Sequence, residues 1–275
     1  MEVAMVDFAS LGQETIGIWN RNADFWDERM GEGNEFHKFL IEPTQLKLLS
    51  LQAGERVLDI GCGNGQFVRK MASLGADVLG VDAAPGMIEH ARRRTSTDTD
   101  YAGSVQFDVV DATDEAAMVA LGAGEFDSVV CTMALMDISS ITPIASAARL
   151  LLKPSGRMVF SVMHPCFNST QGFRQTLERE ENDGELTERV SVQVTRYIEP
   201  HTHKGLAMVG QPLPQNYFHR PISALLGVFF AVGFVVDAIK EPVFPEDLPD
   251  DDKLGWLMYK DIPPVLSVRL VNLHR

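Results

Sequence analysis

Short apolar runs alternate with longer helix-like segments along the chain from residue 56 onward. The apolar runs are rich in β-branched residues and lie at 56–60, 78–82, 105–110, 126–131, 156–162, 234–239 and 265–271. The segments between them are typical of helices near 66–74, 85–94, 114–121, 141–152 and 222–232. This alternation predicts an α/β fold, in which a seven-stranded, mostly parallel sheet carries helices on both faces.

Two segments do not fit the alternation. Before the first strand, apolar positions recur at helical spacing, so we expect a helical lid within residues 1–45 that packs over the sheet edge. Residues 164–221 are too long for a simple connection and contain the alternating stretch ERVSVQVTRYIEP, which predicts an additional strand. We therefore expect one domain over residues 1–275, with an inserted cap or substrate-binding segment at 164–221.

The charge balance favours a small molecule over nucleic acid as partner. The 275 residues carry a formal net charge of −14, whereas affinity for nucleic acid depends on Lys and Arg that neutralise phosphates. The longest uncharged run, residues 221–236, is shorter than the ~18 to 20 residues of a membrane span, and we expect a buried helix followed by a buried strand there. The sequence allows a homo-oligomer without specifying one.

The cysteines and histidines indicate neither a disulfide framework nor a metal site. Cys62, Cys131 and Cys166 are far apart and lack CxxC spacing, and the N-terminus lacks the pattern of a secretory signal, so a reducing cytoplasm is the expected location. His201 and His203 have an HxH spacing, but no carboxylate or cysteine follows at a suitable offset. We expect no metal.

A glycine-rich turn, VLDIGCGNG at residues 57–65, joins the first strand to the following helix. In an open α/β sheet such a turn lets a nucleotide-like ligand approach the backbone, although a tight turn without a ligand has the same pattern. Gly61, Gly63 and Gly65 are followed by Gln66, where the dinucleotide fingerprint requires a last Gly or Ala. The departure disfavours a pyrophosphate ligand.

Acidic residues occur at three neighbouring predicted strands. Asp59 lies in the first, Asp82 ends the second, and Asp111 follows the third. At Asp82 an acid can accept hydrogen bonds from both hydroxyls of a ribose. Asp111 can also be read as a helix cap and Asp59 as a residue that holds the turn. Together the three acids favour a ligand rich in hydrogen-bond donors.

The chain resembles the class I methyltransferases that use S-adenosylmethionine, over residues 50–165 and again at 222–271. The resemblance is carried by VLDIGCGNG, VLGVDAAPGMIEHAR, FDVVDAT, FDSVVCTMALMDI and LLKPSGRMVFSV, and by the ending AVGFVVDAIKEP with PVLSVRLV. It implies a Rossmann-like sheet with an antiparallel last strand and S-adenosyl-L-methionine as cofactor, with S-adenosyl-L-homocysteine as product.

The resemblance also implies contacts for each part of this cofactor. Its methionine end is assigned to Asp59, Gly61 and Gly63, its ribose to Asp82 with Ala83, its adenine to Asp111 with Ala112, and the floor beneath the sulfonium to the segment from Cys131 to Met133. From the lid, Trp26 could cover the site while Arg29 pairs with the cofactor carboxylate. The alternative is a core tryptophan beside a surface arginine.

The residues that act on the acceptor are expected after the fifth strand. His164 follows that strand directly and is the first choice for a base or orienting group, unless it pairs with the lid. Tyr217, His219 and Arg220 precede the penultimate helix, and Arg220 could bind a carboxylate or phosphate. They could equally hold the cap against the core.

These observations predict an S-adenosylmethionine-dependent methyltransferase that acts on oxygen, nitrogen or carbon of a small molecule. Two alternatives remain: a non-catalytic module that binds S-adenosylmethionine, and an NAD-dependent oxidoreductase. The position of Gln66 argues against the second alternative.

Overall fold

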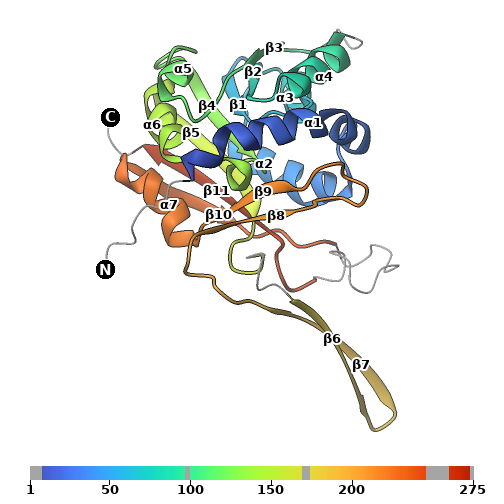
Figure 1. Ribbon diagram of the computed structural model, residues 1–275. Coiled ribbons are helices and arrows are strands. Elements are labelled where there is room, and N and C mark those ends of the chain that lie inside the picture. The colour runs from blue at the N-terminus through green and yellow to red at the C-terminus, as the bar shows by residue number, and fades with distance from the viewer. Residues whose placement is uncertain (1–7, 97–99, 169–173, 246–259, 273–275) are drawn as a thin grey trace.

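A seven-stranded sheet forms the centre of the protein (Figure 1). The computed structural model describes residues 8–96, 100–168, 174–245 and 260–272. The strands lie in the order β10-β11-β5-β4-β1-β2-β3. Their bounds are β1 (Arg56–Ile60), β2 (Asp77–Asp82), β3 (Ser104–Val109), β4 (Phe126–Thr132), β5 (Leu152–Met163), β10 (Phe234–Lys240) and β11 (Val265–Asn272).

All seven predicted strands and the direction of the last one are confirmed. Strand β11 lies between β5 and β10 and runs antiparallel to both, whereas the other paired strands of this sheet are parallel. Because parallel strands end at the same edge, the segments that follow β1, β2 and β4 meet there. This edge positions the candidate site.

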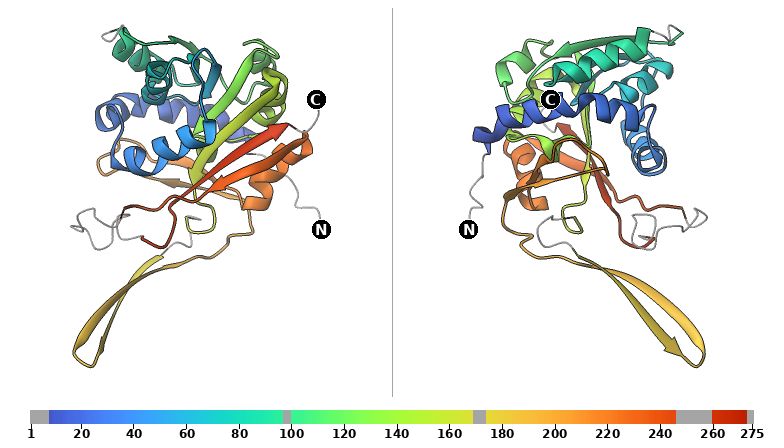
Figure 2. Two further views of the ribbon diagram at one scale, coloured as in Figure 1. Left: turned by 180° about the vertical axis from the view of Figure 1, so that it is seen from behind. Right: turned by 45° about the vertical axis from the view of Figure 1, so that its right-hand side comes forward.

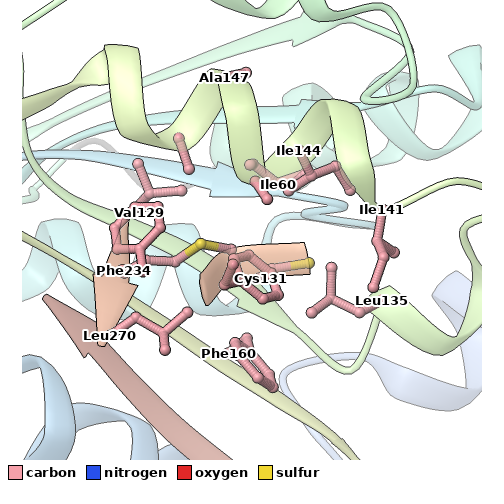
Figure 3. Packing of buried hydrophobic residues seen from close by; sticks show 14 of the residues in the cluster. Ile60, Val129, Cys131, Leu135, Ile141, Ile144, Ala147, Phe160, Phe234 and Leu270 are labelled. Atoms are coloured by element: carbon pink, nitrogen blue, oxygen red, sulfur yellow. The ribbon is translucent and has the colours of Figure 1, made fainter. Parts of the chain in front are cut away.

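Helices cover the two faces of the sheet, as the alternation predicted. They are α2 (Glu42–Leu49), α3 (Gln66–Ser73), α4 (Pro85–Ser96), α5 (Glu115–Val119), α6 (Thr142–Leu151) and α7 (Ile222–Ala231). Side chains alternate along each strand, so Val57 packs with α2 and α3 while its neighbour Leu58 packs on the other face with α6 and α7. Figure 3 shows the core on the α6 and α7 side, where Phe160 and Phe234 are fully enclosed.

The segment after β5 forms two ribbons, so the prediction of one additional strand was incomplete. Strands β6 (Arg174–Asn182) and β7 (Glu185–Gln193) pair as a hairpin that projects from the body of the protein in every view (Figures 1 and 2). Strands β8 (His201–Gly205) and β9 (Gln215–His219) pair as a second ribbon. This second ribbon contacts the N-terminal helix and the turn η3 (Leu135–Asp137).

The predicted N-terminal helix is present as α1 (Gly12–Met30), preceded by the turn η1 (Ala9–Leu11). It packs against α4 on one side and contacts β9 on the other. A π-helical turn, η2 (His37–Ile41), leads from it into α2. Of the helices in the described ranges, none is long and apolar enough to cross a bilayer.

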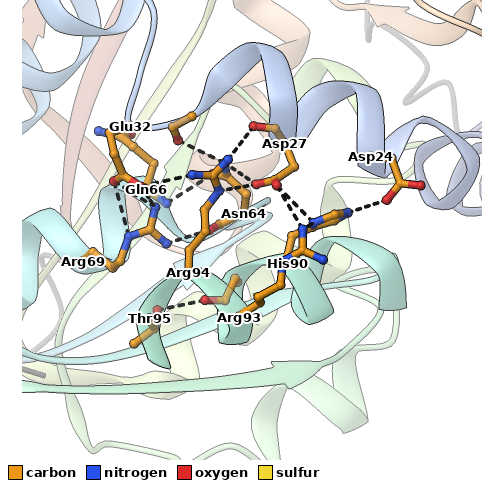
Figure 4. Close-up of polar contacts among 12 residues, drawn as sticks. Asp24, Asp27, Glu32, Asn64, Gln66, Arg69, His90, Arg93, Arg94 and Thr95 are labelled. Atoms are coloured by element: carbon orange, nitrogen blue, oxygen red, sulfur yellow. Dashed lines mark hydrogen bonds and ion pairs between the residues drawn. The ribbon is translucent and has the colours of Figure 1, made fainter. Parts of the chain in front are cut away.

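A buried carboxylate fastens α1 to α4. Asp27 on α1 forms ion pairs with His90, Arg93 and Arg94 on α4, and its Oδ1 also accepts a hydrogen bond of 3.1 Å from the Asn64 side chain (Figure 4). Burial alone would raise the pKa of Asp27. The hydrogen bonds from Arg94 and Asn64, with the charges of His90 and Arg94, bring this pKa below its usual value.

Replacing this carboxylate is expected to loosen the lid. Asp27→Asn removes the charge that Arg94 contacts and should destabilise the protein by about 2 kcal/mol at pH 7, measured by urea unfolding. Because the folded pKa lies below the unfolded one, this contribution is present above the unfolded pKa and is lost as the pH falls through the folded pKa. The difference from the natural protein should therefore shrink below about pH 4.

Asp24→Asn is the matched control for this prediction. Asp24 lies one turn earlier on α1 and pairs with His90, but its side chain is 97% exposed, so the same change should cost less than about 1 kcal/mol. Equal destabilisation by the two variants would contradict the assignment of the anchoring role to Asp27.

Candidate functional site

A cavity of about 770 Å³ opens at the carboxyl edge of the sheet, beneath α1 and beside the β8–β9 ribbon. Its volume falls within the range of small-molecule sites. One part of its wall, which we call the glycine-loop half, comes from the ends of β1 to β4. The other part, the ribbon half, comes from η3, β8, β9 and the start of α1.

The glycine turn takes a conformation that requires small residues. Gly61 has a φ of +71°, and a Cβ placed on it would lie 2.6 Å from the Cβ of Ala134. The backbone N–H groups of Gly61 and Cys62 donate to the carbonyl of Val81 over 2.8 and 3.0 Å, so the turn folds over the end of β2. This arrangement brings the turn and β2 together in one wall.

The three acids singled out in the sequence all line this cavity. Asp59 is 1% exposed, and within the described part of the chain its Oδ1 has no hydrogen-bond partner. Burial, followed by the charge of Asp82, raises the pKa of Asp59 to about 8. The turn is therefore not held by this oxygen.

Asp82 and Asp111 are held by backbone amides. Asp82 accepts hydrogen bonds from the N–H groups of Gly63 at 3.0 Å and Ala84 at 2.9 Å; burial raises its pKa, and these two bonds offset part of the rise. Asp111 accepts from the backbone and hydroxyl of Thr113 at 2.9 and 2.7 Å. The cap of α5 is Asp114, so the alternative of Asp111 as the helix cap does not hold.

The small residues that the sequence assigned beside these acids also line the cavity. Of the segment expected to form the floor beneath the sulfonium, Cys131 does not. Ala83, Ala112 and Met133 line the cavity. Cys131 is fully buried and belongs to the core between the sheet and α6 (Figure 3). The expected floor segment therefore contributes through Thr132, which points to the face opposite Cys131, and through Met133, which follows the end of β4 with a φ of +53°.

The lid brings Trp26 to the cavity and leaves Arg29 outside it. The Trp26 ring lies 5.0 Å from that of Trp19, and its buried Nε1 has no hydrogen-bond partner among the described residues. Arg29 is exposed and its guanidinium lies 5.5 Å from the ring centre of Phe25. Contact with Phe25 holds the charge of Arg29 away from the wall.

His164 is buried beside the cavity but does not line it. Its Nε2 lies 2.8 Å from a carboxylate oxygen of Glu241, and its Nδ1 accepts from the backbone N–H of Cys166 at 3.2 Å. Burial lowers its pKa, and Glu241 opposes only part of that effect. Glu241 directly follows β10, so His164 pairs with that strand end and not with the lid, which was the expected alternative.

The residues expected from the cap do reach the ribbon half. Tyr217 stacks on His203 at 5.1 Å, and burial followed by the charge of Asp137 raises its pKa. His219 approaches the carbonyl of Tyr197 at 2.7 Å, and burial lowers its pKa. Arg220 donates to three backbone carbonyls over 2.8 to 3.1 Å, those of Leu135, Ile138 and Ser139. Arg220 therefore joins β9 to η3.

Several polar residues of the wall were not assigned from the sequence, and among them are one aspartate and two histidines. Asp137 and His203 line the ribbon half, and His37 lies in the π-helical turn after α1. The Nδ1 of His37 is 3.0 Å from Oδ1 of Asn34, and burial lowers the pKa of His37 to about 4. Asp137 lies in the segment after the fourth strand that carried the resemblance, so its position there was the available signal. The described residues contain no cluster of three or more potential metal ligands.

Comparison with known proteins gives one family match and several relatives. The model of a methyltransferase domain matches residues 51–204. A ubiquinone biosynthesis O-methyltransferase from Xanthomonas axonopodis pv. citri is 34% identical over 145 residues, which are 52% of this chain and 57% of that protein. The protein of the same name from Thiobacillus denitrificans is 32% identical over 152 residues, which are 54% of this chain and 62% of that protein.

The fold is shared with solved structures as well. An S-adenosylmethionine-dependent methyltransferase from Mesorhizobium loti superposes with a TM-score of 0.59 at 22% identity, covering 83% of this chain and 95% of that one. The match spans little more than half of the length of the two O-methyltransferases. Since the family model matches more than half of the residues of this chain, the chain belongs to the methyltransferase domain family.

Proposed function

We propose that this protein transfers the methyl group of S-adenosylmethionine to a small molecule. The observation that carries the proposal is the convergence of Asp59, Asp82 and Asp111 on one cavity beside a glycine turn. Ammonium, ribose hydroxyls and adenine amine are all hydrogen-bond donors, so carboxylates suit this cofactor. Gln66, where the dinucleotide fingerprint requires Gly or Ala, argues against the pyrophosphate of NAD.

Each part of the cofactor has a residue that fits it. The unpartnered Oδ1 of Asp59 suits the ammonium group. Two backbone amides fix the carboxylate of Asp82, and its remaining lone pairs suit the ribose hydroxyls. Asp111 with Ala112 suits the adenine, and Trp26 covers the site from α1.

The chemistry needs little covalent participation from the protein. When bound, the cofactor supplies an electrophilic methyl group. The chain aligns the acceptor for an in-line approach and keeps water out with Trp19, Trp26 and Met133, which line the cavity. Tyr217 is placed to contact the acceptor, whereas His164, Arg29 and Cys131 lie outside the wall and are assigned no contact with the reacting groups.

The names of the two bacterial relatives support oxygen as the acceptor atom, since both are O-methyltransferases. The hydrophobic and aromatic wall supports a small molecule as acceptor. A cytoplasmic location stays a prediction from the sequence.

Loss of the ribose contact is the direct test of the cofactor assignment. Asp82→Ala should weaken binding of S-adenosylhomocysteine by about 10 to 100-fold in calorimetry, because hydrogen bonds to a charged group contribute about 1.5 to 3 kcal/mol. Asp77→Ala, at the opposite end of β2, should leave the affinity unchanged. Circular dichroism would verify that both variants fold.

Two results would overturn the proposal. One is unchanged affinity for S-adenosylhomocysteine in the Asp82 variant. The other is binding of NAD but not of S-adenosylhomocysteine to the natural protein, measured side by side. A protein that binds S-adenosylhomocysteine but transfers no labelled methyl to any metabolite extract would instead be the non-catalytic module.

Asp59 should make the ligand-free protein less stable as the pH rises. Its folded pKa of about 8 lies above the unfolded value near 4, so between these values only the unfolded chain ionises. Stability then falls by up to about 1.4 kcal/mol per pH unit until the folded carboxyl ionises. Asp59→Asn removes this effect, so its stability relative to the natural protein should increase from pH 5 to pH 8 in urea unfolding.

The same variant should bind S-adenosylhomocysteine more weakly, because the ammonium group loses its charged partner. Asp183→Asn, in the exposed turn between β6 and β7, is the matched control and should change neither the pH dependence nor the affinity. A constant stability difference across the pH range would show that Asp59 is ionised in the folded protein.

A further inference from the structure

Asp137 is a buried acid that the cofactor assignment does not use. It is the last residue of η3, four positions after Met133, and both residues line the cavity. The Asp137 residue is 8% exposed. Asp137 therefore lies in the ribbon half of the cavity, close to Met133 of the segment expected beneath the reacting methyl group.

Buried amides hold this carboxyl group from one side only. Gln215 on β9 donates its Nε2 to Oδ1 of Asp137 at 3.0 Å, and Gln211 donates to the side-chain oxygen of Gln215 at 3.0 Å. Among the described residues, Oδ2 of Asp137 has no hydrogen-bond partner and Asp137 forms no ion pair. A hydrogen-bond acceptor is thus available beside the cavity.

The charges around the cavity argue against an anionic acceptor. Besides Asp137, the wall contains Asp59, Asp82 and Asp111. Its two Lys and Arg side chains are both engaged: Lys204 pairs with Glu14 at 2.5 Å, and Arg220 donates to backbone carbonyls. A carboxylate or phosphate on the acceptor would therefore lie near acidic side chains, and no Lys or Arg among the described residues of the wall would be free to pair with it.

The aromatic side chains of the ribbon half favour an aromatic molecule. His203 and Tyr217 are paired across β8 and β9, and their rings are stacked with an interplanar angle of 12°. The cavity wall also contains Phe36 and three methionines, namely Met133, Met163 and Met208. Flexible methionine and aromatic side chains pack well against an aromatic ring.

We infer that the acceptor is an uncharged aromatic alcohol whose hydroxyl donates to Oδ2 of Asp137, which makes Asp137 the residue that selects the acceptor. This inference rests on the proposed methyltransferase function. As the hydroxyl oxygen bonds to the methyl carbon, the carbon–sulfur electron pair stays on sulfur and the hydroxyl proton passes to Asp137. The products are a neutral ether, a thioether and a protonated carboxyl group.

The environment of Asp137 suits a proton acceptor. Burial raises the pKa of this carboxyl group, and the hydrogen bond from Gln215 offsets only part of the rise. A carboxylate with a raised pKa is a better base near neutral pH. Burial, followed by the charge of Asp137, raises the pKa of Tyr217. Tyr217 therefore stays protonated and lines the cavity as an uncharged side chain.

Three naphthalene probes separate the features of this inference. With the protein saturated by S-adenosylhomocysteine, calorimetry would compare 2-naphthol, 2-methoxynaphthalene and 2-naphthoate, which present a donor, no donor and an anion. We expect 2-naphthol to bind at least about 10-fold more tightly than the other two, the value of one hydrogen bond to a charged group. In Asp137→Asn this preference should fall to about 2-fold or less, because an amide carries no charge.

Asp108→Asn is the matched control, since Asp108 is exposed on β3 and does not line the cavity. It should keep the full preference for 2-naphthol. Both variants should bind S-adenosylhomocysteine as the natural protein does, because the amide oxygen introduced by Asp137→Asn can still accept from Gln215.

The outcomes distinguish this inference from the proposed function. If S-adenosylhomocysteine does not bind to the natural protein, the proposed function fails. If it binds but 2-naphthol binds no better than 2-naphthoate, or does not bind, the inference about Asp137 is overturned while the cofactor assignment stands. Retention of the full preference in Asp137→Asn would also overturn it.

Discussion

Carboxyl groups buried without a cation are the constraint on which the arrangement of this protein depends. Asp59, Asp82 and Asp137 all face one cavity, and burial raises the pKa of each. Such groups are unfavourable in a folded protein unless hydrogen bonds or a ligand compensate them. Asp27 is also buried, but Arg94 and His90 lower its pKa. Asp27, which has a structural role, is thus paired with cations, whereas the acids of the cavity remain available to hydrogen-bond donors.

The rest of the fold keeps these acids in place. The parallel arrangement of β1, β2 and β4 brings their ends to one edge, and the glycine turn folds over the end of β2. The Asp27 cluster fastens α1 to α4, and its member Asn64 lines the cavity (Figure 4). In the ribbon half, Arg220 donates to three carbonyls in and after η3 and so fixes the segment that carries Asp137. Charged residues therefore support the site mostly from outside it.

Much of the cofactor side was predictable because its determinants are local. The glycine turn and the acids at strand ends follow directly from strand periods and short spacings, and Asp59, Asp82 and Asp111 all line the cavity. Predictions for some single side chains were less successful. His164 turns to Glu241, Arg29 lies over Phe25, and Cys131 enters the core. The partner of His164 lies 77 positions further along the chain, where no local pattern identifies it.

The sequence by itself determined the seven strands, because alternating apolar periods and a glycine turn restrict the backbone locally. The resemblance of its motifs to class I methyltransferases also indicated the antiparallel last strand and the family. Only the tertiary structure decided the ribbon half of the cavity. His203 meets Tyr217 through the pairing of β8 with β9, and Gln215 meets Asp137 across 78 positions of the chain. Contacts between residues so far apart depend on how the elements pack, and no short sequence pattern records that packing.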